Sequence, residues 1–202
     1  MKLSVSPGET ERNSWYAQSV NGKYFIMNKF LEEIQEQPEA LKQTFCYYRS
    51  EEGKKSLKTV CALWKSGEYD RIVFTGMGSS YFISQAAATM ISSASIPASA
   101  INAGELLHFQ SPSLTERTLL IAVSQSGESY ELLKKQRRLP ITVVGITNES
   151  GSSLAVMATH CLLCKAGKEE MTSTKTFITT YLAVYLLAES LKRHEVNEEA
   201  LD

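Results

Sequence analysis

Short, nearly continuous apolar segments alternate with helix-compatible stretches from residue 71 onward, and this alternation limits the folds open to the chain. The clearest apolar segments cover residues 119–123 and 141–146. Strands that are apolar on both faces are typical of a parallel sheet covered by helices on both sides. We therefore predict strands at residues 71–76, 97–102, 118–124, 141–147 and 159–164.

The intervening stretches predict helices near residues 80–94, 104–109, 129–138, 151–158 and 174–193. Before the sheet, apolar residues from Asn28 onward predict one helix kinked at Pro38 or two short helices. A further helix is predicted over 51–65, ending at Gly67. Residues 1 to about 25 are polar with interspersed aromatic residues, which suggests an irregular arm that docks on a neighbouring surface.

The predicted fold class is α/β, a three-layer α/β/α sandwich with a five-stranded, flavodoxin-like parallel sheet and an N-terminal helical extension. A length of 202 residues suffices for one well-buried domain with an appendage. We expect residues 1–50 to form the arm and helical extension and residues 51–193 the binding domain. Residues 194–202 are expected to be a polar tail or the start of a linker to a missing second domain.

Composition excludes several partner classes. With 43% hydrophobic and 21% charged residues, the chain has the composition of a globular protein, and its formal net charge is −1. A nucleic-acid or anionic-membrane surface would need a clear basic excess, so neither partner is expected. The sequence contains no membrane-length apolar run and no signal-peptide core, which predicts a cytoplasmic protein.

A C-x-x-C pattern at Cys161 and Cys164, beside His160, invites a metal or redox interpretation. The structural interpretation is favoured, because residues three apart on a strand point to opposite faces. There is also no second cysteine pair to complete a zinc site. We therefore expect no metal, and reduced thiols.

Two predicted strands run directly into loops rich in serine and glycine, at residues 76–80 and 124–129. At a helix start the backbone N–H groups lack intrahelical partners and carry partial positive charge, so they can bind an oxyanion. Both loops fall at the carboxyl ends of parallel strands, where α/β sheets bind ligands. Tyr81 replaces the third glycine of a dinucleotide fingerprint, and no Gly-Lys-Ser/Thr is present, so a compact phosphate ester is predicted.

Four segments in the same order resemble the sugar isomerase (SIS) domain family, the phosphosugar-binding fold found in the isomerase half of glucosamine-6-phosphate synthase and in related two-domain isomerases and deglycases. They are an entry-helix motif at 33–38, Gly-Ser-Ser-Tyr at 78–81, Ser-Gln-Ser-Gly-Glu-Ser at 124–129 and Ser-Thr-Lys-Thr-Phe at 173–177. The third is the most specific. Together they span most of residues 28–192.

The resemblance implies roles for individual side chains. The phosphate of a sugar phosphate would be held by Ser124, Gln125, Ser126 and Ser129. Ser79 and Ser80 would contact the sugar or its phosphate, and Ser173 would close the pocket. For the charged loop residues Glu128 and Lys175 we favour structural roles, a helix start and an ion pair respectively.

Glu105 and His108 form a separate candidate pair, placed just after a predicted strand. At i and i+3 they share a helix face and could supply a general base and a ring-opening group. Related domains carry a catalytic histidine in a similar Gly-Glu-x-x-His stretch, but that stretch usually continues with Gly-Pro, whereas Phe109 follows here. A capping glutamate and an interface histidine are the equally favoured alternative.

Three functional hypotheses follow. The first is the phosphate-holding domain of an isomerase, aminotransferase or deglycase acting on a fructose 6-phosphate-like substrate, with catalytic groups from a second SIS domain. Its chemistry would be cofactor-free proton transfer between C1 and C2. Lys2 stands where a glutaminase half needs cysteine, so no glutaminase activity is expected. The alternatives are a single-domain isomerase working as a homo-oligomer through Glu105 and His108, and a non-catalytic phosphosugar sensor.

Overall fold

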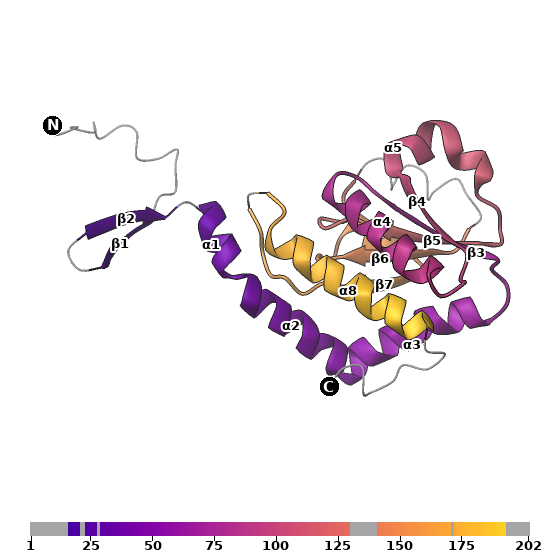
Figure 1. The fold of residues 1–202 in the computed structure, drawn as a ribbon, viewed down its shortest axis with the longest axis horizontal. Coiled ribbons are helices and arrows are strands. Elements are labelled where there is room, and N and C mark those ends of the chain that lie inside the picture. Colours follow the sequence, from indigo (N-terminus) through magenta and orange to yellow (C-terminus); the bar gives the residue numbers. More distant parts are fainter. Residues whose placement is uncertain (1–15, 21–22, 28, 130–140, 171, 193–202) are drawn as a thin grey trace.

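A computed structural model describes residues 16–20, 23–27, 29–129, 141–170 and 172–192. Its centre is a five-stranded sheet of order β4-β3-β5-β6-β7, in which every neighbouring pair is parallel (Figure 1). The strands are β3 (Arg71–Gly76), β4 (Ala98–Asn102), β5 (Thr118–Val123), β6 (Val143–Thr147) and β7 (His160–Leu163). The predicted parallel sheet is confirmed, and each observed strand boundary lies within two residues of its prediction.

Alternate residues of the central strands point to opposite faces of the sheet, as the period of two requires. Phe74 and Ile121 are fully buried in a core cluster that includes residues of α3 (Glu51–Lys65), α4 (Ser79–Ser92) and α8 (Lys175–Lys192). Val73 and Leu120 lie in a second cluster on the other face. That cluster also contains Leu106 and Leu154, from a π-helical turn at Leu106–Gln110 and from α7 (Ser153–Met157).

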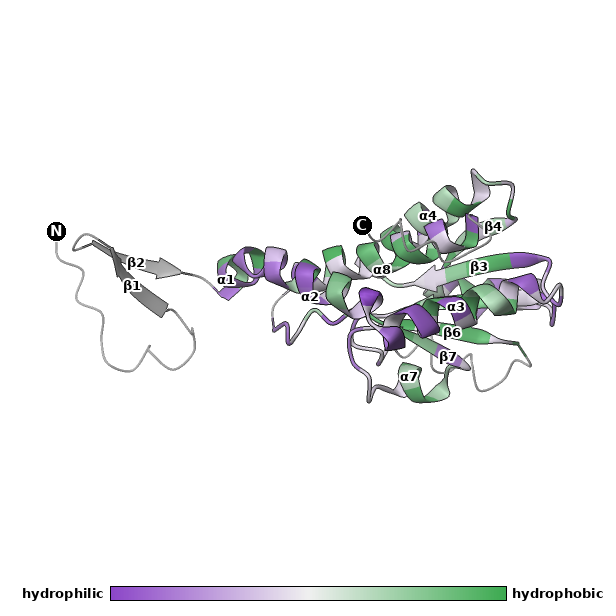
Figure 2. Cartoon of the chain, turned by 90° about the horizontal axis from the view of Figure 1, so that it is seen from below, coloured by the Kyte–Doolittle hydropathy of each residue, from purple (hydrophilic) through white to green (hydrophobic). Residues whose placement is uncertain are grey.

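Hydropathy follows this layering. In Figure 2 the hydrophobic colour runs along β3 and β6, between helices. The largest fully buried side chains belong mainly to the sheet and to the helices that cover it. The α/β sandwich fold is thereby confirmed, with apolar contacts on both faces of the sheet.

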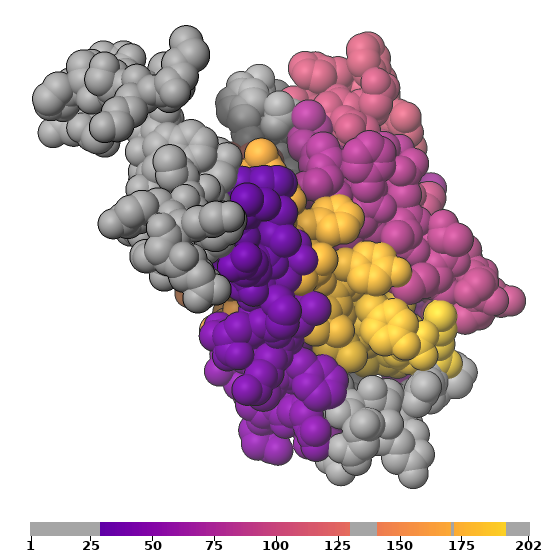
Figure 3. All heavy atoms as spheres, turned by 60° about the vertical axis from the view of Figure 1, so that its left-hand side comes forward, coloured from indigo at the N-terminus to yellow at the C-terminus, as the bar shows by residue number. Residues whose placement is uncertain are grey.

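The N-terminal helices are α1 (Lys29–Gln35) and α2 (Gln37–Arg49), so the two-helix alternative is the one adopted. Pro38 lies in the first turn of α2, where its missing N–H costs no helical hydrogen bond. Helix α3 has the predicted bounds, with Ser50 accepting a hydrogen bond from the Gly53 amide at its start. In Figures 1 and 3, α2 lies alongside α8, against which it packs.

One prediction needs correction, a second is refined, and two further predicted segments lie mostly or wholly outside the described residues. The arm is not wholly irregular, because β1 (Tyr16–Val20) and β2 (Lys23–Met27) pair as an antiparallel hairpin. The short helix predicted near 104–109 is present, as α5 (Ala103–Glu105) continued by the π-helical turn, and a 3₁₀ turn follows at Ser111–Ser113. Most of the helix predicted at 129–138, and the tail at 194–202, fall outside the described residues.

Candidate functional site

The chain leaves β3 toward β4 on one side and later returns to β5 on the other side of β3. The loops after β3 and β5 therefore meet at the point where the strand order reverses. In open parallel sheets this position leaves a crevice at the carboxyl ends of the strands. Both serine-rich loops identified in the sequence lie there.

A polar cavity of about 330 Å³ occupies this crevice. Its walls are formed by Met77, Ser80, Ser124, Gln125, Ser126, Ser129, Asn148, Glu149, Glu169, Ser173 and Thr176. The structure thus brings together six of the side chains predicted to bind the ligand. The seventh, Ser79, lies beside them, because its Oγ accepts a hydrogen bond of 3.4 Å from Gln125 Nε2.

The loop after β5 is folded tightly by its own side chains. The Oγ atoms of Ser124 and Ser129 lie 2.9 Å apart, and Ser124 is only 3% exposed. Gly127 has φ of +68°, and a Cβ there would lie 2.1 Å from Ser152 Oγ. Any side chain at this position would therefore combine backbone strain with a steric clash.

The expectation that unpaired backbone amides line this loop is wrong for two of its residues. The Gly127 amide donates to Ser124 Oγ at 3.1 Å, and the Glu128 amide donates to Ser126 Oγ at 3.3 Å. Short hydroxyl side chains often satisfy nearby amides in this way. The groups left to face the cavity are chiefly hydroxyls and a side-chain amide.

Gln125 links three loops around the cavity. Its carbonyl oxygen accepts hydrogen bonds from Thr147 Oγ1 at 3.1 Å and from the Asn148 amide at 3.0 Å, which fix its backbone to the end of β6. Its side-chain Nε2 donates to Ser79 and to Ser173. Side chains distant in sequence are thereby held at one point.

Glu169 lies in the wall of the cavity at the start of α8. Its Oε1 accepts from the Thr174 amide at 2.9 Å, the Thr176 amide at 3.2 Å and Thr174 Oγ1 at 2.8 Å, and Oε2 accepts from Thr176 Oγ1. Burial raises the pKa of Glu169, but these hydrogen bonds lower it by more, so the pKa lies below its ordinary value of 4.5. The Glu169 carboxylate thus accepts the hydrogen bonds that the Thr174 and Thr176 amides, at the start of α8, could otherwise donate to a ligand.

The two charged loop residues have the structural contacts expected of them. Glu128 Oε1 accepts a hydrogen bond of 2.7 Å from the Ser153 amide, which lowers the pKa of Glu128. Ser153 begins α7, so the carboxylate serves a helix start, although one further along the chain. Lys175 is buried and forms an ion pair with Glu36.

Glu105 and His108 are not brought into the cavity. Both side chains are exposed, on α5 and on the π-helical turn that follow β4. The His108 ring instead lies 6.1 Å from the ring of Phe109, centroid to centroid. Their catalytic role stays a prediction, and within a single copy neither side chain lines the cavity.

Sequence reasoning missed five residues of the cavity wall, one of which, Thr176, lies within the motif at 173–177 but was given no role. Asn148 and Glu149 directly follow β6, a third strand ending at the same sheet edge, so their position could have been inferred from topology. Met77 could have been inferred in the same way. Glu169 gave no such signal, because it lies in a long connection whose path the sequence pattern does not determine.

Among the described residues, no group of three or more His, Cys, Asp or Glu is placed to hold a metal ion. Cys161 and Cys164 are both free thiols. Burial raises the pKa of Cys161 to about 11 and that of Cys164 to about 12, so both thiols are protonated at neutral pH. Nor does the described part of the chain include a helix long and apolar enough to cross a membrane.

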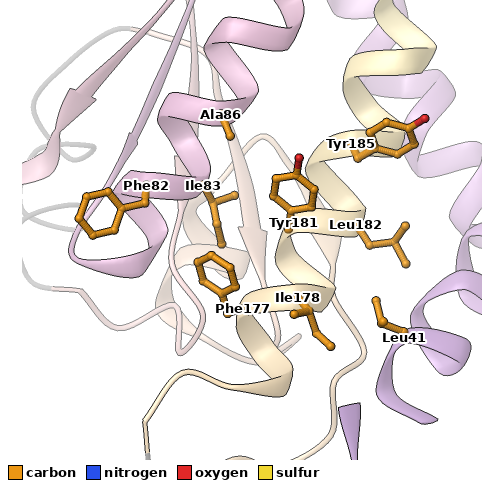
Figure 4. A pocket seen from close by; sticks show the side chains of 9 residues that line it. All are labelled: Leu41, Phe82, Ile83, Ala86, Phe177, Ile178, Tyr181, Leu182 and Tyr185. Carbon is orange, nitrogen blue, oxygen red and sulfur yellow. The ribbon is translucent and has the colours of Figure 1, made fainter. Parts of the chain in front are cut away.

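A second, apolar groove of about 600 Å³ lies between α2, α4 and α8. Figure 4 shows Phe177 and Tyr181 projecting from α8 toward the α4 side and Leu41 approaching from α2. Its other lining residues are Phe82, Ile83, Ala86, Ile178, Leu182 and Tyr185. Apart from the two tyrosine hydroxyls, these side chains offer no polar atom.

Comparison with known proteins agrees with this geometry. The isomerizing glutamine–fructose-6-phosphate aminotransferase of Pyrococcus horikoshii is 34% identical over 166 residues, which cover 80% of this chain and 27% of that protein. The chain thus spans about a quarter of this relative's length.

Solved structures share the fold. The C-terminal domain of glucosamine-fructose-6-phosphate aminotransferase from Francisella tularensis matches with a TM-score of 0.69 and 27% identity, covering 86% of this chain and 50% of that one. The Vibrio vulnificus NanR protein complexed with ManNAc-6P matches with a TM-score of 0.66 and 22% identity over 85% of this chain and 67% of that one. A family model described as SIS domain matches residues 68–190. Because this match covers more than half of the chain, the protein belongs to the SIS domain family.

Proposed function

We propose that the polar cavity binds a sugar phosphate, with the phosphate held by the side chains that follow β5. The observation that carries this proposal is the convergence of Ser80, Ser124, Gln125, Ser126, Ser129 and Ser173 on one cavity at the point where the strand order reverses. Hydroxyl and amide donors can bind a phosphate and still release it. Hydroxyls and carboxylates are also suited to the hydroxyl groups of a sugar.

The charge of the cavity supports binding through hydrogen bonds. Among the described lining residues only Glu149 and Glu169 carry charge, and none is Lys, Arg or His. The ligand's phosphate would therefore be held without a direct cation. Ser126 and Ser124, whose hydroxyls now satisfy loop amides, can rotate to donate to a phosphate oxygen.

The ligand class is a hexose 6-phosphate resembling fructose 6-phosphate. The aminotransferase relatives are named for fructose 6-phosphate, and the NanR structure holds ManNAc-6P. Isomerase, aminotransferase and deglycase chemistry all begin from such ligands, through proton transfer between C1 and C2. None of these requires a cofactor.

The proton-transfer groups would come from outside this cavity. Glu169 accepts four hydrogen bonds and its pKa is lowered, both of which make it a poor proton acceptor. We therefore infer that catalysis needs a second SIS domain, on the same protein or on another copy of the chain. Glu105 and His108, exposed on the surface, are the candidates that a copy could contribute.

A thermal-shift panel of hexose and pentose phosphates tests the binding proposal, with inorganic phosphate and the unphosphorylated sugars as controls. We expect the unfolding temperature to rise with sugar phosphate concentration and to rise less, or not at all, with the free sugars. Failure of every sugar phosphate to stabilise the chain would contradict the proposal.

A second experiment distinguishes the two alternative functions, a single-domain isomerase and a non-catalytic sensor. Isomerase activity of the chain alone that is lost in Glu105→Gln and His108→Ala would favour the self-sufficient homo-oligomer. Saturable binding without turnover, also after addition of a second SIS domain, would favour the sensor. A light-scattering mass above that of one chain would support the oligomer that both the resemblance and the missing catalytic groups suggest. We expect the cytoplasm as compartment, in keeping with four free thiols.

A further inference from the structure

Helix α1 is oriented against its own hydropathy. Glu33 is its one buried residue and is fully inaccessible, whereas Phe30, Leu31 and Ile34 are 36%, 49% and 36% exposed. Burying a carboxylate is unfavourable, and burying apolar side chains is favourable. Polar contacts, rather than the hydrophobic effect, must therefore determine which face of α1 turns inward.

Polar contacts from α1, Glu36 and α2 reach one segment, residues 164–170 and 172–174 between β7 and α8 together with Lys175 at the start of α8. Glu33 Oε1 accepts a hydrogen bond of 2.7 Å from the Glu170 amide, while Glu33 Oε2 has no partner among the described residues. Glu36, between α1 and α2, forms the ion pair with Lys175 at the start of α8. On α2, Thr44 Oγ1 donates to the carbonyl oxygen of Cys164. In Figure 3 the indigo atoms of these helices lie directly against the orange and yellow atoms that lead into α8.

The same segment forms a wall of the polar cavity. Glu169 and Ser173 line the cavity directly. The first residues of the segment are held by Asn148, which follows β6. Its side chain accepts a hydrogen bond of 2.7 Å from the Ala166 amide and donates one of 2.8 Å to the Gly167 carbonyl oxygen. The wall is thus held between the end of β6 and the two N-terminal helices.

We propose that Glu33 and Glu36 are positioning residues that hold this wall where Ser173 and Glu169 can contact the sugar of the bound ligand. The inference rests on the proposed function, which supplies the ligand. The phosphate end depends mainly on the loop after β5, which bonds to the wall through Gln125 and Ser173. Helices α1 and α2 are then part of the binding site, and loss of their contacts should weaken the sugar end more than the phosphate end.

Affinity measurements with two probes test this division. The probes are the hexose 6-phosphate that stabilises the wild-type chain most and inorganic phosphate, titrated into wild type, Glu33→Ala, Glu33→Gln and Glu36→Gln. We expect Glu33→Ala to weaken hexose 6-phosphate binding about tenfold and Glu36→Gln about threefold, with a smaller loss of inorganic phosphate affinity in each variant. Glu33→Gln keeps an acceptor for the Glu170 amide and should recover most of the loss. Glu39→Gln, an exposed carboxylate on α2, is the matched control.

The possible outcomes show whether the positioning role of Glu33 and Glu36 fails or the proposed binding of a sugar phosphate fails. Hexose 6-phosphate binding by wild type with equal affinity in the folded variants would overturn the inference and leave the proposed function intact. Parallel weakening of both probes would also overturn it, because a general loss of structure does not separate sugar from phosphate. Absence of sugar phosphate binding by wild type would overturn the proposed function. If Glu33→Ala fails to fold, Glu36→Gln decides, and an unchanged affinity there counts against the inference.

Discussion

The polar cavity and the apolar groove lie on the same domain and share α4 and α8, yet they are built from opposite chemistry. The cavity is lined by hydroxyl, amide and carboxylate side chains, most of them fixed by hydrogen bonds within the protein. The groove is lined by aromatic and aliphatic side chains and encloses about 600 Å³ against about 330 Å³ for the cavity. Under the proposed function the ligand binds in the smaller of these two hollows.

The two regions differ in how their side chains are held in place. Most of the predicted binding side chains of the cavity have a defined partner, such as the Ser124 and Ser129 hydroxyls or Gln125 and Ser173. In the groove, Phe82 is 65% exposed and Tyr181 42% exposed, held in place by the packing of their helices alone. Substitutions in the two regions should therefore change different properties.

Replacement of Gly127 by valine is expected to have the largest effect on the cavity. The new side chain would meet Ser152 and adopt φ near +68°, costing about 2–4 kcal/mol of stability and distorting the loop that follows β5. Denaturant unfolding measures the loss of stability. Calorimetric titration with a hexose 6-phosphate measures the effect of the distorted loop, and there we expect no detectable binding. Gly151→Val is the control, because no atom lies within 4 Å of a Cβ at Gly151 and its φ is not in the left-handed region. Equal behaviour of the two variants would contradict the tight loop.

Removing the hydroxyls should separate binding from stability. For Ser124→Ala combined with Ser126→Ala we expect a loss of about 1–2 kcal/mol of sugar phosphate binding per residue and a smaller change in unfolding free energy. The double variant Ser93→Ala with Ser113→Ala is the control, because both serines are exposed and each hydroxyl donates to the carbonyl oxygen three residues earlier. Unchanged affinity in the first double variant would remove the premise that these hydroxyls hold the phosphate.

The fold could be predicted from the sequence because its signals are local and repeated. Each buried strand is an apolar run with a turn at its end, and the sheet order places residues 76–80 and 124–129 together without further information. The phosphate side of the candidate site followed from the same reasoning. Its residue types matched a known motif, and Ser80, Ser124 and Ser126 now line one cavity.

The rest of the site depends on contacts between segments far apart in the chain. Glu33 and Glu170 are 137 positions apart, and nothing in the pattern of α1 indicates that its carboxylate faces inward. Glu169 was missed for another reason: its four hydrogen bonds reach only Thr174 and Thr176, but the path of the connection between β7 and α8 has no sequence pattern. The hairpin of β1 and β2 could have been predicted from the Asn-Gly pair in the sequence at residues 21–22, which is a hairpin signal, whereas the π-helical geometry of Leu106–Gln110 has no distinct periodicity.

In the groove, Phe82→Ala is expected to leave both properties almost unchanged. Because the ring is 65% exposed, its removal should alter the unfolding free energy by no more than about 0.5 kcal/mol and leave hexose 6-phosphate affinity as it is. Denaturant unfolding and calorimetric titration measure the two quantities. A loss above about 1 kcal/mol would show that the ring is covered in solution, and weaker ligand binding would show that the groove takes part in the site.

The smallest expected effect is a change in how steeply the unfolding temperature falls at acid pH. It arises from Glu169, in the wall of the polar cavity. The pKa of Glu169 is lower in the folded chain than its ordinary value of 4.5, so the unfolded chain binds a proton more readily at this carboxyl. Its contribution to stability is therefore complete above pH 4.5 and is lost as the pH falls through the folded-state pKa. Replacing Glu169 by glutamine should flatten the fall in unfolding temperature below pH 4.5, whereas Glu39→Gln, on the exposed face of α2, should leave its slope unchanged. A wild-type slope in Glu169→Gln would mean that the hydrogen bonds from Thr174 and Thr176 do not hold a charged carboxylate in solution. The wall of the cavity would then be stabilised by the contacts of Glu33, Glu36 and Asn148.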